Sequence, residues 1–417
     1  RIDARMVHEA GGSDAQELAA LIASAVDTLR RLDNRTDISA LIPRMSFALA
    51  LDGNYGLGVA KLRAARRLWA RILDAMDHQA VPMRLQAVSS ARILSRYDAW
   101  TNMLRNTAAA FAGAVGGADI MTIRPFNEAL GIPEELGRRI ARNTQIIAME
   151  ESQLGRVADP TGGAWFTETF ADDLAEAAWK EFQTIEAEGG YAEALVSGAF
   201  QKRIADVREA RAKDIARRKV PITGVSEFPL LDEITAPVAD MPAVTPKDGV
   251  SAEGFAHFVK VDLPAEEGDT TAESLPRIRL AEDFEALRDA ASAAPKRPSI
   301  FLATLGPIAE HNARADFARN LFAAGGLDAT QPPVPPQSVS EAVAAFKASG
   351  TRIACICGAD ARYEDEAAEI AKALKAAGAD HVWLAGKFEG DGIDSNIFMG
   401  CDVLHTLKLA HTTLGVS

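Results

Sequence analysis

The chain has little cysteine, few aromatic residues and no long apolar run. Its 417 residues include three Cys, too few for a disulfide framework. Cys355 and Cys357 flank Ile356 in an apolar run, so we expect buried small side chains in a reducing cytosol, with a redox role as the alternative. No apolar run approaches the roughly 20 residues of a membrane span, and no signal peptide opens the chain. These absences predict a cytoplasmic protein that does not bind a membrane.

Positive charge is also scarce. The 45 Lys and Arg residues against 58 Asp and Glu residues give a net charge of -13, which argues against a nucleic-acid partner. The basic segment 202–219, KRIADVREARAKDIARRK, alternates acids with bases. It is therefore either a solvated helix face with internal ion pairs or a surface for an anionic partner, and the alternation favours the solvated face.

Residues 1–217 alternate short apolar runs with amphipathic stretches. The patterns predict strands at 45–51, 83–89 and 118–123, and helices at 55–76, 98–115 and 133–152, followed by a wholly helical region at 166–216. Pro133 is expected at the first position of its helix. Repeated strand–helix units predict a parallel sheet, either a barrel or a doubly wound sheet. Because Arg1 opens directly into this pattern, we expect the chain to be a fragment.

The remaining residues form two further regions. Residues 218–297 predict a linker, with a helical turn or two near 281–293, because proline and acidic residues recur: Pro221, Pro229, Pro237, Pro242, Pro246, Pro264, Pro276, Glu266, Glu267 and Asp269. Residues 298–417 resume the alternation. They predict strands at 298–305, 352–357, 381–385 and 396–399, and helices at 310–324, 339–348, 362–377 and 401–414. This order is typical of a small doubly wound domain.

Several segments in fixed order resemble the methylmalonyl-CoA mutase family. They are RMSFALALDG (44–53), KLRAARRLWAR (61–71), NEALGIP (127–133), RRIARNTQI (138–146), EES (150–152) and DPTGGAWF (159–166). The resemblance implies that 1–217 is the C-terminal part of a (β/α)8 TIM barrel for an acyl-CoA thioester, with the N-terminal part missing. It further implies that 218–297 is the family's linker and 298–417 a flavodoxin-like domain in the place that binds cobalamin. The reaction it implies interconverts methylmalonyl-CoA and succinyl-CoA with adenosylcobalamin.

The resemblance breaks down in the loop that should bind cobalamin. The family pattern K-M-G-Q-D-G-H-D-R-G, whose His binds cobalt and whose Asp orients that His, falls on 304–313, TLGPIAEHNA. The family's Lys, Asp, His and final Gly fall on Thr304, Ile308, Glu310 and Ala313. His311 lies one residue late, so we expect a solvated bystander in the first turn of a helix rather than a ligand. The predicted domain therefore has an empty or collapsed ligand face.

The acyl-CoA positions implied by the resemblance are also depleted. The family's Y-H-M-Q-E-A-G falls on 5–11, RMVHEAG, which places Met6 at the His that contacts the thioester. The family's R-T-H-S-Q falls on 84–88, RLQAV, so a second His becomes Gln86. If this segment were a strand, His8 would share the face of Met6. The two positions would then be roughly 6–7 Å apart, which is too far for His8 to make the thioester contact of the lost His.

Three residues match family contacts with CoA, and they are the candidate substrate-binding remnants: Arg44, Ser46 and Arg84. For Arg44, closing the entry of a strand is an equal alternative. Gly162 and Gly163 could cradle a phosphate, but without a full Gly-rich loop a tight turn is favoured. No metal site and no catalytic residue are predicted.

The losses together predict a partner without catalysis. Some members of the family pair a large catalytic subunit with a small subunit of the same fold that lacks cobalamin and substrate. The resemblance implies that this chain is such a small subunit, with adenosylcobalamin bound by a homologous large subunit and no cofactor bound here. The alternative is an active acyl-CoA isomerase in which His311 or His8 serves a rearranged site.

Overall fold

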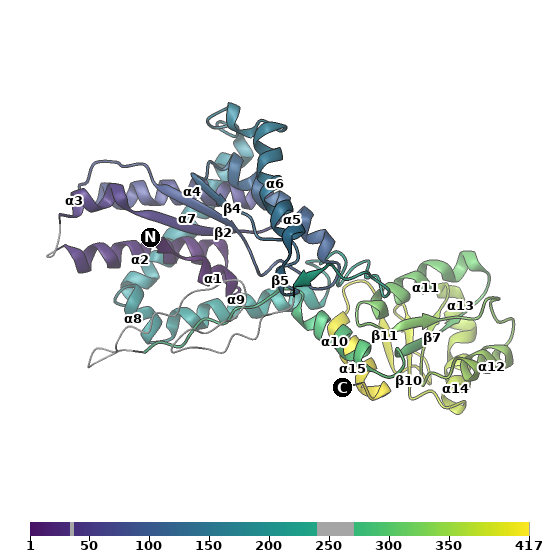
Figure 1. Cartoon of the computed structure of the whole chain (residues 1–417). Coiled ribbons are helices and arrows are strands. Elements are labelled where there is room, and N and C mark those ends of the chain that lie inside the picture. Colours follow the sequence, from purple (N-terminus) through teal and green to yellow (C-terminus); the bar gives the residue numbers. More distant parts are fainter. Residues whose placement is uncertain (34–36, 240–270, 417) are drawn as a thin grey trace, which may run out of the picture. The chain divides into compact units, whose positions relative to one another are not determined.

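The structure, a computed structural model, describes residues 1–33, 37–239 and 271–416 and divides into two compact α/β units (Figure 1). The first unit comprises Arg1–Ala210 and Thr235–Arg279, and the second comprises Arg211–Ile234 and Leu280–Ser417. The segment predicted as a linker, 218–297, contributes residues to both units. Part of that segment lies outside the described residues, including Pro242, Pro246, Pro264, Glu266, Glu267 and Asp269.

The first unit is built on a parallel sheet in the order β1-β2-β3-β4. The strands are β1 (Ile2–Asp3), β2 (Ser46–Leu51), β3 (Arg84–Ser89) and β4 (Ile120–Thr122). Three of them lie where the apolar runs predict strands, and the predicted parallel sheet is confirmed. The two-residue β1 is not predicted, since it is defined by pairing with β2 rather than by its own pattern.

Long helices cover one face of this sheet. They are α2 (Asp14–Leu32), α4 (Tyr55–Ala75), α5 (Asn102–Val115) and α7 (Trp165–Ala187), and α7 packs on both α2 and α4. Alternate residues of β2 point into this layer, where the ring of Phe47 lies 4.8 Å from that of Trp69. Helix α2 begins at a capping box in which Ser13 and Gln16 exchange hydrogen bonds. The sheet therefore has one apolar face, and its other face carries the side chains of Ser46 and Gln86.

The first unit has further elements. They are α1 (Arg5–Glu9), α3 (Ile38–Leu41), η1 (Ile42–Arg44), η2 (Ala99–Thr101), α6 (Glu135–Glu150), η3 (Leu154–Arg156) and α8 (Tyr191–Val196), with β5 (Ile132–Pro133) paired antiparallel to β6 (Val238–Ala239). Helix α9 (Ala199–Ala216) begins in the first unit and ends in the second, because the boundary follows Ala210. The prediction for Pro133 is wrong, because this residue pairs in β5 and α6 begins two residues later. Gly162 and Gly163 form a turn, in which Gly163 has a φ of +76°.

The second unit contains a five-stranded parallel sheet in the order β8-β7-β9-β10-β11. Its strands are β7 (Ser299–Thr304), β8 (Asp328–Thr330), β9 (Ile353–Cys357), β10 (His381–Ala385) and β11 (Ser395–Ile397). Its helices are α10 (Glu282–Ala293), α11 (Ile308–Ala323), α12 (Val339–Ser349), α13 (Asp360–Arg362), the π-helical turn η4 (Tyr363–Ala367), α14 (Ala368–Ala376) and α15 (Val403–Leu414). Cys355 and Cys357 are buried in β9, as predicted.

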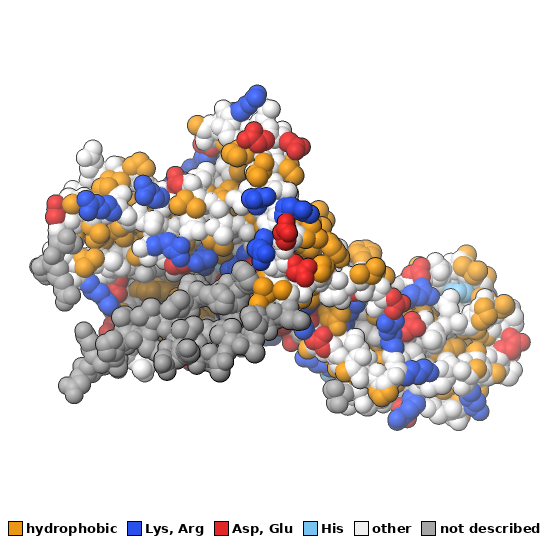
Figure 2. All heavy atoms as spheres, in the orientation of Figure 1, with side chains coloured by type: hydrophobic (Ala, Val, Ile, Leu, Met, Phe, Trp, Pro, Cys, Tyr) orange, Lys and Arg blue, Asp and Glu red, His pale blue; other side chains and the backbone are white. Residues whose placement is uncertain are grey.

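Two surface features bear on function. Lys and Arg side chains are interspersed with Asp and Glu on the face shown in Figure 2, without a large patch of one sign. In the described part of the chain, no helix combines the length and apolar character needed to cross a bilayer.

Candidate functional site

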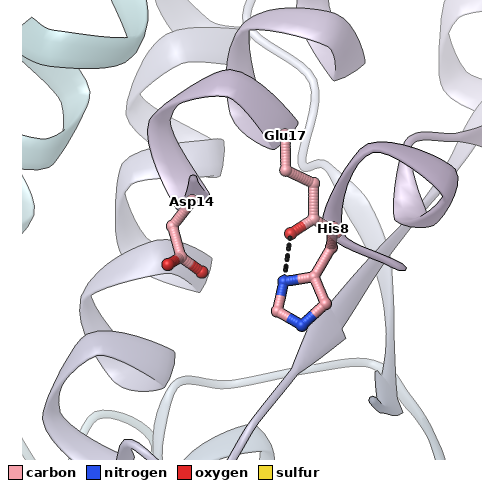
Figure 3. A group of neighbouring side chains, drawn as sticks. All are labelled: His8, Asp14 and Glu17. Atoms are coloured by element: carbon pink, nitrogen blue, oxygen red, sulfur yellow. Dashed lines mark ion pairs between the residues drawn. The ribbon is translucent and has the colours of Figure 1, made fainter. Parts of the chain in front are cut away.

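A buried group of charged side chains lies where β1, β2 and β3 end. His8 comes from α1, Asp14 and Glu17 from α2, and Lys61 from α4, and all four are buried. Figure 3 shows a Glu17 carboxylate oxygen facing Nδ1 of His8, with Asp14 beside them. Burying an unpaired charge is costly, so each of these groups requires a partner.

Lys61 is the centre of this buried network. Its Nζ lies 2.5 Å from Oδ1 of Asp14 and 2.6 Å from Oε2 of Glu17. Burial lowers the pKa of Lys61, but the two carboxylates outweigh burial, so the pKa stands above its usual value. Burial raises the pKa of Asp14, yet Lys61 holds that pKa well below its usual value. For Glu17 burial prevails and the pKa is raised. The two carboxylates therefore favour the charged form of the Lys61 amine at the centre of the cluster.

The cluster satisfies backbone groups that lack a neighbouring strand. β1 ends at Asp3, opposite Ala48, and Ala50 points its backbone groups toward the same side two residues later. There the N–H of Ala50 donates to Oε1 of Glu17 at 2.7 Å, and Nζ of Lys61 donates to the carbonyl of Ala50 at 2.7 Å. Buried backbone groups are almost always paired. Glu17 and Lys61 thus take the place of a strand beside β2.

Arg92 and Glu9 extend the network to the loop after β3. Nη1 of Arg92 donates to the carbonyls of His8 at 2.7 Å and of Gly12 at 2.9 Å. The carboxylate of Glu9 accepts the backbone N–H groups of Ala91 and Arg92, each at 2.9 Å. These contacts fix the end of α1 against the loop that follows β3. The network therefore holds three strand ends together by backbone contacts.

His8, Asp14 and Glu17 also form the one group of potential metal ligands found among the described residues, with donor atoms within 4.8 Å of one another. Burial, with Arg92 and Lys61 nearby, holds the pKa of His8 well below its usual value, so its imidazole is neutral. A divalent cation would nevertheless have to displace the Lys61 ammonium, which already neutralises both carboxylates. The arrangement is a completed ion network, and we assign no metal to it.

Met6 and His8 do not share a face, contrary to the prediction from strand geometry. Both lie in helix α1, where Met6 is 56% exposed and His8 is fully buried. Side chains two residues apart point in different directions on a helix. Nε2 of His8 lies 3.0 Å from Oγ of Ser90. His8 is therefore committed to the buried network and does not replace the residue lost at Met6.

The other predicted acyl-CoA residues lie on the face of the sheet away from the long helices. Ser46 and Arg84 are register partners at the amino ends of β2 and β3, and Arg44 is exposed just before β2. Gln86 accepts from Nη1 of Arg1 at 2.8 Å and donates to Oγ1 of Thr122 at 3.0 Å. The three remnants are thus brought together. The length of β2, roughly 15–20 Å, separates them from the buried network.

In the second unit the residues of the predicted cobalamin loop face different partners. Thr304 is buried at the end of β7, whereas Ile308, the first residue of α11, is 64% exposed and Ala313 is exposed. Oε2 of Glu310 lies 2.8 Å from Nε of Arg362. No position in this loop presents an unengaged imidazole.

His311 lies in the first turn of α11 as predicted, but it is buried rather than solvated. Its Nδ1 lies 3.1 Å from the carbonyl oxygen of Gly306. The turn at Gly306, with a φ of +74°, directs this carbonyl toward the start of the helix. The histidine therefore closes its own turn, which the sequence pattern does not show.

The buried network was missed in the sequence, although it has a signal there. Lys61 falls within the apolar stripe of α4, between Leu57 and Leu68, where a charge needs a partner. Asp14 and Glu17 follow the capping residue Ser13 and lie among the buried, mostly apolar residues of α2. Together these positions indicate an interhelical ion pair.

Comparisons with known proteins identify the family of this chain. Residues 1–299 match the family described as methylmalonyl-CoA mutase. The methylmalonyl-CoA mutase small subunit of Streptomyces virginiae is 43% identical over 100% of the chain and 64% of its own length. The methylmalonyl-CoA mutase small subunit of Propionibacterium freudenreichii subsp. shermanii is 35% identical over 100% of the chain and 63% of its own length. The mitochondrial methylmalonyl-CoA mutase of Bos taurus is 35% identical over 54% of the chain and 31% of its own length.

These matches have two consequences. The chain spans just under two thirds of the length of the small subunits that it matches. The relatives named small subunit cover all of it, whereas the bovine mutase covers about half. The family match covers far more than half of the residues. The chain therefore belongs to the methylmalonyl-CoA mutase family.

Proposed function

We propose that this chain is the small, non-catalytic subunit of a heterodimeric methylmalonyl-CoA mutase. In this proposal a homologous large subunit binds adenosylcobalamin, which supplies the radical for isomerising methylmalonyl-CoA and succinyl-CoA. The chain itself binds no cofactor and stabilises the fold of its partner. The observation that carries the proposal is the loop after β7, where Glu310, at the cobalt-ligand position, is paired with Arg362.

The residues of the second unit do not fit cobalamin. Ile308, at the position of the orienting Asp, has no group that accepts a proton from an imidazole, and His311 is bonded to its own turn. A cavity of about 340 Å³ lies beside this loop, lined in part by Thr304, Gly306 and Arg362. This volume is at the low end for drug-sized ligands, and adenosylcobalamin is far larger. No step of the reaction is therefore assigned to this unit.

We assign the two units by the same proposal. Residues 1–217 form the C-terminal part of a (β/α)8 barrel with a helical extension, and 218–297 serve as the linker. Residues 298–417 form a flavodoxin-like domain, which the order β8-β7-β9-β10-β11 supports because it corresponds to 2-1-3-4-5. The large subunit is the expected partner. We expect the assembly in the cytoplasm, without nucleic acid.

The acyl-CoA residues support a subunit without turnover. Met6 and Gln86 stand at the positions of the family's two His residues, so neither imidazole is present. The side chain of Gln86 is hydrogen-bonded to Arg1 and Thr122. Arg44, Ser46 and Arg84 remain as substrate-binding remnants. The alternative of an active isomerase requires His8 or His311, but both are buried and face the chain's own groups. We therefore propose no catalytic residue in this chain.

The experiment that tests the proposal is co-expression of the chain with a large subunit. We expect co-purification at one copy each, corrin absorbance only from the large subunit, and turnover only in the assembly. Substituting His311→Ala in the assembly should leave turnover unchanged. Stoichiometric corrin bound by the chain alone, or loss of turnover in the His311→Ala assembly, would show that the proposal is wrong.

A further inference from the structure

The carboxyl edge of the sheet in the second unit is crossed by two side chains from outside the loop after β7. One is Tyr363, the first residue of the π-helical turn η4, and the other is Arg314 of α11. Neither position was singled out in the sequence. In open parallel sheets this edge is where ligands usually bind, so side chains that cross it decide what else can lie there.

Tyr363 joins the ends of two neighbouring strands. The side chain is 1% exposed. Its Oη accepts the N–H of Gly358, just after β9, at 2.8 Å and donates to the carbonyl of Ala385, the last residue of β10, at 2.7 Å. Both hydrogen-bonding roles of the phenol are thus satisfied by backbone. The ring also contacts that of Phe388, with 6.1 Å between centroids.

Arg314 lies over the same ring. Its guanidinium carbon lies 5.5 Å from the ring centroid of Tyr363, within the range of a cation–π contact. One terminal nitrogen donates to the carbonyl of Ala385, and the other lies 2.8 Å from Oδ1 of Asp360. Arg314 therefore connects the helix after β7 with the segments that follow β9 and β10.

Two glycines make room for these side chains. A Cβ on Gly386, whose φ is +154°, would lie 2.0 Å from Nη1 of Arg314 and 3.1 Å from the ring of Tyr363. A Cβ on Gly358 would lie 3.0 Å from Leu305 and 3.3 Å from the same ring. The backbone of both loops thus approaches the chain's own side chains as closely as a glycine loop elsewhere approaches a bound ligand.

We infer that Tyr363 and Arg314 form an internal plug, which takes the place of a ligand at the carboxyl edge of the second sheet. This inference rests on the proposed function only in treating this edge as the family's cofactor face. It goes further by naming the residues that fill the edge. A domain that had only lost its ligating residues would keep an open gap at this edge. The plug fills that gap, because Tyr363 and Arg314 connect the segments after β7, β9 and β10 by hydrogen bonds that need no cofactor.

A cavity-complementation experiment on the full chain tests the plug. Tyr363→Ala removes a buried aromatic side chain, and we expect the melting temperature of the second unit to fall by about 10 °C. The variant should regain several degrees in p-cresol, the free form of the lost side chain, because p-cresol can refill the cavity and restore the hydrogen bonds to the backbone of Gly358 and Ala385. The wild-type chain should gain nothing from p-cresol.

A second variant removes only the hydroxyl and keeps the ring. In Tyr363→Phe we expect faster hydrogen exchange at the Gly358 amide by at least tenfold and no response to p-cresol. This measurement remains decisive if Tyr363→Ala does not fold. The inference would be overturned if the Gly358 amide of Tyr363→Phe exchanged at the wild-type rate, or if Tyr363→Ala were as stable as the wild type. So would an equal p-cresol response in the wild type. Since no readout involves corrin or turnover, failure here leaves the proposed function standing.

Discussion

Replacing Lys61 by Met isolates the electrostatic role of the buried network. Methionine keeps most of the apolar stem but removes the ammonium that lies 2.5 Å from Asp14 and 2.6 Å from Glu17. Lys61 is 1% exposed, so water cannot take its place. Removing one partner of a buried ion pair costs about 3–5 kcal/mol. A typical domain is stable by about 5–15 kcal/mol, so this is a large share of the total.

The pH dependence identifies the cause of that loss. Without Lys61, burial leaves the pKa of Asp14 and of Glu17 above the unfolded values, and the folded state then binds more protons than the unfolded state. Stability of the variant should therefore rise relative to wild type as the pH falls from 7 toward 5. In the wild type, Lys61 holds the pKa of Asp14 low, so the contribution of Asp14 is present above its unfolded pKa and is lost as the pH falls below it.

Scanning calorimetry and urea unfolding of the full chain at pH 7 and pH 5 provide the assay. The matched control is Lys180→Met in α7, since the Lys180 side chain is 70% exposed in its ion pair with Glu176. The control should have the melting temperature of the wild type, because exposed ion pairs contribute little to stability. A Lys61→Met chain within about 1 kcal/mol of wild type at pH 7 would refute the reasoning. A deficit that does not shrink at pH 5 would refute it as well.

Three further predictions follow from the same contacts. Arg92→Met should lower the free energy of unfolding in urea by about 3–5 kcal/mol, because it leaves buried carbonyls of His8 and Gly12 without their donor. A loss under about 1 kcal/mol would show that these two hydrogen bonds contribute little. Gly386→Ala should lower the melting temperature of the second unit more than Gly378→Ala, because both have positive φ but only Gly386 has atoms within 4 Å of the added Cβ; equal losses would show that backbone strain alone matters. His8→Gln should narrow its stability gap to wild type as the pH falls from 7.5 to 5.5, because burial holds the folded pKa of His8 below its unfolded value and the wild type loses that stability on acidification; a gap independent of pH would mean that folding does not shift the pKa of His8.

The main strands were predictable because each is a short, mainly apolar run between turn signals. β2, β3, β7, β9 and β10 all have this pattern, and each lies within a residue or two of its predicted range. Two short strands, β1 and β8, were not predicted, although the three-residue β4 and β11 were. β1 and β8 have two and three residues, and they exist because a neighbouring strand offers hydrogen bonds.

The segment around Met6 and His8 shows why the site was harder to predict than the fold. Five residues carry no measurable period, so RMVHE fits a strand and a helix equally well. The choice of helix α1 decides that His8 is buried against Glu17 while Met6 is exposed. Partners of Lys61 and Tyr363 likewise lie in other elements, such as Glu17 of α2 for Lys61 and Ala385 of β10 for Tyr363. Residue type indicated that such groups need partners, but only the fold identifies them.

The pairing of Ala50 with Glu17 and Lys61 has a consequence for recognition of other chains. A strand that outlasts its neighbour exposes backbone donors and acceptors, which an extended peptide can pair with. Here that stretch of β2 is already bonded to an acid and an amine from two helices. The sheet therefore cannot be lengthened at this place by a foreign segment, and the ion network protects the protein against unwanted strand addition.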